Sequence, residues 1–126
     1  MIDHLTLQVG DTAASRDFYT AVLAPLGLRP AYTDGEGTGF AASDSRAPFW
    51  LTPAVGASSR QLHVAFRAAS RSAVDDFYAA AVRLDAEVLH APRIFNEYHP
   101  AYYASFVRDP DGNNIEAVCH HAPKPT

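Results

Sequence analysis

Two histidines and one glutamate are the residues of this sequence best suited to bind a divalent metal ion. His4 and His63 each precede a short stretch of alternating apolar and polar residues, and Glu116 lies between Ile115 and Ala117. Burying a carboxylate in so apolar a stretch is costly unless a partner or a metal ion compensates its charge. Two imidazoles and a carboxylate form a ligand set typical of Fe(II), which also suits Zn, Mn or Ni. Three protein ligands leave coordination positions open for water or substrate.

A loop rich in ionisable and aromatic side chains is the second candidate for chemistry. It runs from Asn96 to Tyr103 and contains His99 beside a proline. We predict catalytic roles for His99 and Tyr102. The imidazole of His99 could transfer protons, hydrogen-bond an oxyanion or serve as a fourth metal ligand. The same loop could also be an ordinary exposed segment.

Four aromatic residues are predicted to contact a substrate: Trp50, Tyr98, Tyr103 and Phe106. Trp50 and Tyr98 would form apolar walls for a ring-bearing molecule, although Trp50 could instead belong to the core. The proposed metal ligands have structural alternatives as well. His4 and His63 could be hydrogen-bonded structural histidines, and Glu116 could face solvent from a strand.

The chain repeats itself at an offset of 59 residues. His4 aligns with His63, and residues 17–19 align with residues 76–78, both reading Asp-Phe-Tyr, without a gap. Repeats of this kind indicate that one structural unit occurs twice. The phenylalanine of each triplet is predicted to lie in the core, and neither triplet is given a catalytic role. If a pseudo-twofold axis relates the two copies, the two histidines point at one shared cavity.

Each copy predicts the element order βαβββ. Apolar residues alternate with polar ones in the expected strands and recur at about four-residue steps in the expected helices. The first copy is expected to have a strand over 5–9, a helix over about 11–27, and strands over 29–33, 39–42 and 48–52. The second copy is expected to have a strand after His63, a helix from about Ser70, and strands over 87–91, 103–108 and 114–119. Together they predict one domain, residues 1–120, with repeat one over 1–53, a linker over 54–60, repeat two over 61–120, and a flexible tail over 121–126.

Composition excludes several classes of partner. The net charge is −4 and the basic residues form no stripe, so nucleic acid is not expected as a partner. No apolar run approaches the length of about 20 residues that a membrane helix needs. The N-terminus does not read as a signal peptide, and the single cysteine cannot form an intrachain disulfide. We therefore expect a cytoplasmic protein.

The sequence resembles the vicinal oxygen chelate superfamily, which includes glyoxalase I, bleomycin-resistance proteins and extradiol dioxygenases. The resemblance runs from Ile2 to about His120 and includes Asp3-His4, the two Asp-Phe-Tyr helices and His63. Its most specific part is segment 109–116, which reads Asp-Pro-Asp-Gly-Asn-Asn-Ile-Glu. It implies an α+β fold in which two βαβββ repeats form a cupped, incomplete barrel. It also implies a divalent metal ion held by Glu116 and chelated by adjacent substrate oxygens, in a homodimer.

Departures from the family pattern bear on the reaction. In glyoxalase I the last strand of the first copy supplies a second glutamate, whereas here that region reads Phe-Trp-Leu over residues 49–51. Extradiol dioxygenases use one histidine from each copy and one glutamate, as His4, His63 and Glu116 would.

The dioxygenases also carry a histidine and a tyrosine ahead of the Asp-Pro turn. His99 stands at a compatible spacing, but Phe106 replaces the tyrosine, so that Tyr102 or Tyr103 would have to supply the hydroxyl. The resemblance therefore implies a metal-dependent lyase, isomerase or ring-cleaving dioxygenase. The alternative is a non-catalytic binding protein of the bleomycin-resistance type, which would sequester an aromatic or cationic molecule.

Overall fold

The structure, a computed structural model, describes residues 2–43, 46–56 and 61–124. Residues 57–60 of the predicted linker and residues 125–126 of the predicted tail lie outside the described residues. The first copy consists of β1 (Leu5–Val9), α1 (Thr12–Leu23), a 3-10 turn η1 (Ala24–Leu26), β2 (Arg29–Asp34), β3 (Gly37–Ala41) and β4 (Phe49–Pro53). The second copy consists of β5 (His63–Arg67), α2 (Arg71–Arg83), β6 (Val88–Ile94), β7 (Tyr103–Arg108) and β8 (Asn114–Cys119).

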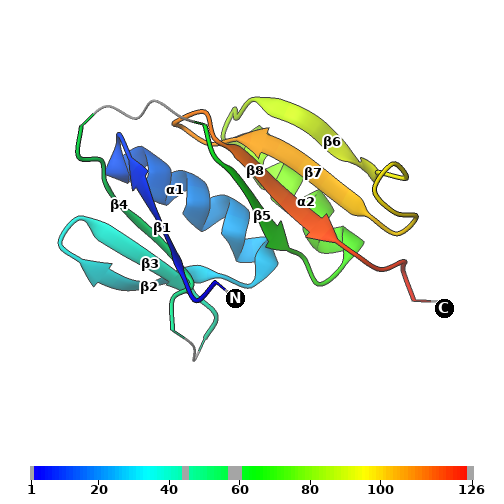
Figure 1. Ribbon diagram of the computed structural model, residues 1–126, viewed down its shortest axis with the longest axis horizontal. Coiled ribbons are helices and arrows are strands. Elements are labelled where there is room, and N and C mark those ends of the chain that lie inside the picture. The colour runs from blue at the N-terminus through cyan, green and yellow to red at the C-terminus, as the bar shows by residue number, and fades with distance from the viewer. Residues whose placement is uncertain (1, 44–45, 57–60, 125–126) are drawn as a thin grey trace.

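Each copy forms one four-stranded mixed sheet, and the two sheets have the same topology. Their strand orders are β1-β4-β3-β2 and β5-β8-β7-β6. In each sheet the first strand pairs in parallel with the last strand of its copy, and the other pairings are antiparallel. Figure 1 shows the two open sheets side by side, with α1 and α2 behind them. This arrangement confirms the predicted α+β fold of two βαβββ units, and the sheets do not close into a complete barrel.

The two helices begin where the sequence supplies N-caps. The carboxylate of Asp11 accepts a hydrogen bond from the backbone of Ala14, and the hydroxyl of Ser70 accepts one from Ala73. The first helix ends earlier than predicted, because Pro25 has no backbone N–H to continue the α-helical ladder. The chain tightens into η1 and leaves it through Gly27 at φ 85°, a conformation that glycine adopts readily.

Side chains alternate between two faces along every strand, and this alternation places the core. Apolar residues such as Leu7, Leu51 and Ile115 face the helices, where they pack with Phe18 and Phe77. The phenylalanines of the two Asp-Phe-Tyr triplets therefore lie in the core, as predicted. No helix of the described residues covers the opposite face of either sheet (Figure 1), and the residues that alternate with the core set lie on that face.

A buried hydrogen-bond network ties the first copy to the turn before β8. The hydroxyl of Tyr19 on α1 donates to Asp109 at 2.5 Å. Asp109 also accepts from the backbone and the side-chain amide of Asn113, whose own oxygen accepts from the backbone of Leu62. Burial, followed by the charge of Asp109, raises the pKa of Tyr19, so that the hydroxyl keeps its proton. The network fixes the turn that leads into Glu116.

Tyr19→Phe is expected to lower the free energy of unfolding by about 1.5–3 kcal/mol, because it leaves a buried carboxylate short of one donor. The matched control is Tyr78→Phe at the equivalent position of the second copy, where no hydrogen bond of the hydroxyl is found among the described residues. That variant should change stability by less than about 0.5 kcal/mol. Urea unfolding of both proteins measures the difference, and equal losses would show that Tyr19 does not support the turn.

Neither described helix has the length and apolar character needed to cross a membrane. The cytoplasmic location stays a prediction from the sequence.

Candidate metal centre

Glu116 and His63 meet on the open face of the second sheet. Glu116 lies in the middle of β8 and alternates with Ile115 and Ala117, which face the core. It is only 1% exposed, which excludes the alternative that it faces solvent. Nε2 of His63, at the start of β5, lies 3.0 Å from Oε1 of Glu116. Two ligands about 2.1 Å from one metal ion lie about 3.0–3.4 Å apart, so the spacing suits a shared ion.

The orientation of the His63 ring indicates which nitrogen is available for a metal. Nδ1 lies 3.1 Å from the backbone oxygen of Asn114, which can only accept a hydrogen bond. Nδ1 therefore carries the proton, and in the neutral ring Nε2 presents its lone pair toward Glu116. Two acceptors then face each other, which requires either a protonated ring or a cation between them. A backbone carbonyl behind a ring nitrogen is also the usual support of a metal-binding histidine.

Tyr102 completes the surroundings of the carboxylate. Its hydroxyl donates a short hydrogen bond to Oε2 of Glu116, the oxygen that does not face His63. Burial and then this hydrogen bond raise the pKa of Tyr102, so the hydroxyl remains a donor at neutral pH. Phe106 lies on the same face, where its ring stacks on His63 with centroids 5.9 Å apart. Glu116 is thus held from both oxygens beside an aromatic wall.

Of the two tyrosines predicted as hydroxyl donors, the structure places only Tyr102 beside Glu116. Tyr103 lies on the helix side of β7, where its hydroxyl donates to Asp75 and Arg71 lies over its ring. Neighbouring residues of a strand point to opposite faces of the sheet. Tyr103, which was predicted to contact a substrate together with Phe106, therefore lies on the opposite face of the sheet from Phe106. Burial and the contact with Asp75 raise the pKa of Tyr103 to about 12.

The loop residues His99 and Tyr98 surround Tyr102 without reaching Glu116. Nδ1 of His99 accepts from the backbone of Ala101, so its Nε2 carries the proton and donates to His120 at 3.0 Å. The rings of His99 and Tyr98 both contact that of Tyr102, and Tyr98 is 62% exposed. The contact with His120 has no signal in the sequence, because the two residues become neighbours only through the fold. The predicted roles of His99 and Tyr98 stay predictions.

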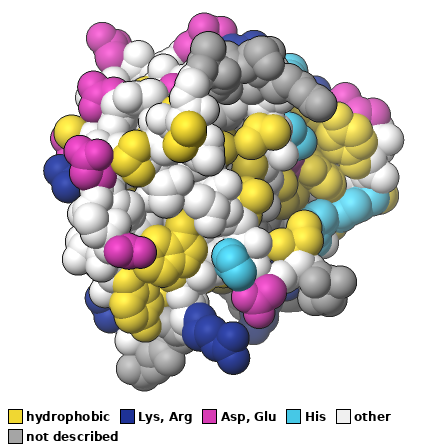
Figure 2. Space-filling view, turned by 60° about the vertical axis from the view of Figure 1, so that its left-hand side comes forward, with side chains coloured by type: hydrophobic (Ala, Val, Ile, Leu, Met, Phe, Trp, Pro, Cys, Tyr) yellow, Lys and Arg dark blue, Asp and Glu magenta, His cyan; other side chains and the backbone are white. Residues whose placement is uncertain are grey.

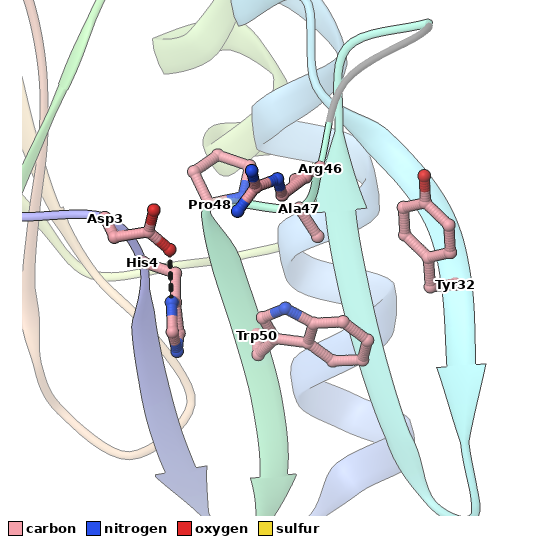
Figure 3. A pocket seen from close by; sticks show the side chains of 7 residues that line it. All are labelled: Asp3, His4, Tyr32, Arg46, Ala47, Pro48 and Trp50. Carbon is pink, nitrogen blue, oxygen red and sulfur yellow. Dashed lines mark hydrogen bonds and ion pairs between the residues drawn. The ribbon is translucent and has the colours of Figure 1, made fainter.

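His4 lies on the open face of the first sheet, away from the His63–Glu116 pair. Its Nδ1 donates to Oδ1 of Asp3 at 2.7 Å, as Figure 3 shows. A carboxylate behind Nδ1 leaves Nε2 free, which is again the arrangement of a metal-binding histidine. Within the described part of the chain, no three His, Cys, Asp or Glu side chains are close enough together to hold a metal ion. The predicted set of three metal ligands, His4, His63 and Glu116, is therefore not assembled within one chain.

Strand register shows what replaces the second glutamate in the first copy. Thr6 and Ala65 are related by the repeat offset, and they pair with Trp50 and Glu116 respectively. Trp50 therefore occupies the position that Glu116 has in the second copy. It is half-buried on the open face and does not belong to the core cluster between sheets and helices. The first sheet presents an indole where the second presents a carboxylate.

A glycine makes room for this indole. Gly39 on β3 pairs with Trp50, and a Cβ atom at that position would come within 2.8 Å of the ring. The equivalent residue beside Glu116 in the second copy is Phe106. Figure 3 shows the indole extending across β3 toward Tyr32 on β2, and the two rings are stacked with centroids 6.2 Å apart. Sequence reasoning missed Tyr32, since only the strand register brings it beside Trp50.

Comparison with known proteins identifies the family. The family model described as the Glyoxalase/Bleomycin resistance protein/Dioxygenase superfamily matches residues 1–117. A glyoxalase/bleomycin resistance protein from Albidiferax ferrireducens T118 superposes with a TM-score of 0.78 at 24% identity, covering 93% of this chain and 97% of that one. No protein of curated function matches the chain.

Two further solved structures carry names with an activity. A lactoylglutathione lyase from Agrobacterium tumefaciens is 22% identical with a TM-score of 0.68, covering 94% of this chain and 92% of that one. A protein from Bacillus cereus described as a possible glyoxalase is 26% identical with a TM-score of 0.66, covering 94% of this chain and 98% of that one. These likenesses show the shared fold, and the family match covers nearly the whole sequence. The chain belongs to the glyoxalase/bleomycin resistance protein/dioxygenase superfamily.

Proposed function

We propose that this protein is a divalent-metal-dependent enzyme acting on a small substrate. The observation that carries the proposal is the pairing of His63 and Glu116. Nε2 of His63 and a carboxylate that is only 1% exposed face each other at 3.0 Å, and each has its other polar atom held by the protein. An isolated buried carboxylate is costly, and a cation at this point would remove that cost.

The third ligand in this proposal is His4 of a second copy of the chain. Among the described residues of one chain, only His63 and Glu116 meet as candidate ligands on the open face of the second sheet, and His4 presents its Nε2 on the open face of the first. A symmetric dimer that places the first sheet of each copy against the second sheet of its partner would form two equivalent three-ligand sites. A homodimer was also the expectation from the family resemblance.

The reaction follows from what such an ion supplies. A divalent ion with open positions acts as a Lewis acid toward adjacent substrate oxygens, which supports lyase, isomerase or ring-cleaving dioxygenase chemistry. The protein's own groups orient the site. Tyr102 holds one oxygen of Glu116, and Phe106 shields the ring of His63. His99 and Tyr102 are the candidates to move a proton, since both carry one on the open side of the second sheet.

Metal uptake tests the proposal. Protein stripped with a chelator and dialysed against Fe(II), Zn, Ni or Mn is expected to retain about one ion per chain after removal of free metal. Tyr102→Phe should weaken binding roughly 10- to 100-fold, as loss of a group that orients a ligand usually does. Tyr98→Phe is the matched control, because Tyr98 is exposed. A protein that remains empty with every ion would overturn the proposal.

A non-catalytic binding protein is the second candidate, favoured by the aromatic pocket around Trp50 on the first sheet. A ring-bearing molecule held there with no metal would need none of the three predicted ligands. Tight ligand binding that is unchanged in His63→Ala, in a protein that takes up no metal, would support this second function.

A further inference from the structure

The open face of the first sheet carries a pocket that contains charged and aromatic walls. Its volume is about 470 Å³, and its walls include Asp3, His4, Tyr32, Arg46 and Trp50. Figure 3 shows these side chains arranged around one opening, with the indole at its floor. On the face of the molecule shown in Figure 2, hydrophobic side chains and histidines lie near one another. A pocket of this volume is in the range that proteins use for small ligands.

The floor of the pocket is built to receive a flat ring. The indole of Trp50 rests with one side on Gly39, whose lack of a side chain allows this close approach. Its plane is 26° from that of Tyr32, so the two rings form a nearly continuous aromatic surface. Flat rings stack favourably on such surfaces in offset arrangements. Trp50 as a whole is half-buried, and it borders the pocket.

Arg46 supplies the polar contact. Among the described residues, no carboxylate forms an ion pair with its guanidinium. The acidic residue of the pocket, Asp3, already accepts a hydrogen bond from His4 at 2.7 Å. A guanidinium offers a planar set of donors that matches a carboxylate with two parallel hydrogen bonds. The pocket therefore has one aromatic floor and one cation that no carboxylate of the described residues pairs with.

We propose that this pocket binds a planar aromatic ring that bears a carboxylate, with the ring on Trp50 and the carboxylate on Arg46. As a binding site it needs only one face of one chain. As the substrate class of the metal site it rests on the proposed function, because His4 stands in the same pocket wall.

The single tryptophan of the chain makes the test direct, since its fluorescence reports only on this pocket. Benzoate is titrated into protein kept in chelator, with excitation of Trp50 and with the indole N–H followed by NMR. Benzyl alcohol, benzylamine and cyclohexanecarboxylate serve as probes that lack the charge, reverse it or lack the flat ring. Benzoate is expected to bind at least roughly tenfold more tightly than benzyl alcohol. Cyclohexanecarboxylate and benzylamine should both bind more weakly than benzoate.

Variants separate the two contacts. Arg46→Gln should weaken benzoate binding roughly tenfold and bring it to the level of benzyl alcohol, while Arg46→Lys should lose less. Gly39→Ala should weaken all ring-bearing probes, because a methyl group there displaces the indole. Arg83→Gln at the end of α2 is the matched control and should change nothing. Equal binding of benzoate and benzyl alcohol, tightest binding of benzylamine, or no effect of Arg46→Gln would each overturn the proposal.

The result is independent of metal because chelator is present throughout. Benzoate binding in a protein that never takes up a metal ion would overturn the proposed enzymatic function and leave this site standing. Metal uptake without benzoate binding would do the opposite. If none of the four probes binds, the proposed binding site is wrong.

Discussion

Glu116→Gln is expected to abolish divalent metal binding in a protein that stays folded. Glutamine keeps the shape of the side chain, an acceptor for the Tyr102 hydroxyl and a polar group toward His63, but it brings no negative charge to a cation. The loss of metal affinity should exceed roughly 100-fold. That factor is the upper end of the usual loss when a residue that orients a metal ligand is removed. Without metal, removing a buried charge should change the free energy of unfolding by less than about 1 kcal/mol. Calorimetric metal titration and urea unfolding measure the two quantities.

Two controls make this result specific. Glu36→Gln removes an exposed glutamate in the turn between β2 and β3 and should leave the metal affinity unchanged. His63→Ala should lose metal to a similar degree as Glu116→Gln, since it removes the other donor of the pair. If Glu116→Gln retains wild-type affinity, the ion binds elsewhere and the proposed centre is wrong. If Glu116→Gln unfolds, the main role of Glu116 is to stabilise the fold.

Mixing two inactive variants is expected to restore metal binding. His4→Ala and His63→Ala each lack one ligand in every site of their own homodimers. In a mixed dimer, one site combines His4 of one chain with His63 and Glu116 of the other and is complete, whereas the second site lacks both histidines. Random pairing therefore makes about one quarter of all sites complete. The metal content of protein unfolded and refolded as an equal mixture measures this fraction.

The matched control refolds each variant alone and combines the products afterwards at low temperature, before subunits exchange. That sample should hold almost no metal. Recovery only after joint refolding would support a site shared between chains. No recovery, with a wild type that binds metal as a monomer, would show that the ligands come from one chain and that the proposed dimer is wrong.

Much of the fold could be predicted from local sequence. The repeat of 59 residues, the strand alternation around Leu7 and Ile115, and the helix caps at Asp11 and Ser70 all act over a few residues, and the structure has the corresponding elements. The ends of some helices and strands differ from those predicted, because a local effect of proline competed with the pattern of apolar residues. Pro25 ended α1 early, and β6 extends to Ile94 through Pro92, which an edge strand tolerates.

The sequence by itself determined which side chains are chemically able to act, since His63, Glu116 and Tyr102 were all predicted before their contacts were known. Only the tertiary structure decided how they are used. Strand register set Trp50 at the position equivalent to Glu116, the pleat turned Tyr102 toward Glu116 and Tyr103 away, and the sheets separated His4 from its predicted partners. Residue type fixes chemical capacity, whereas distance and direction between remote residues come from pairing and packing, which no local pattern encodes.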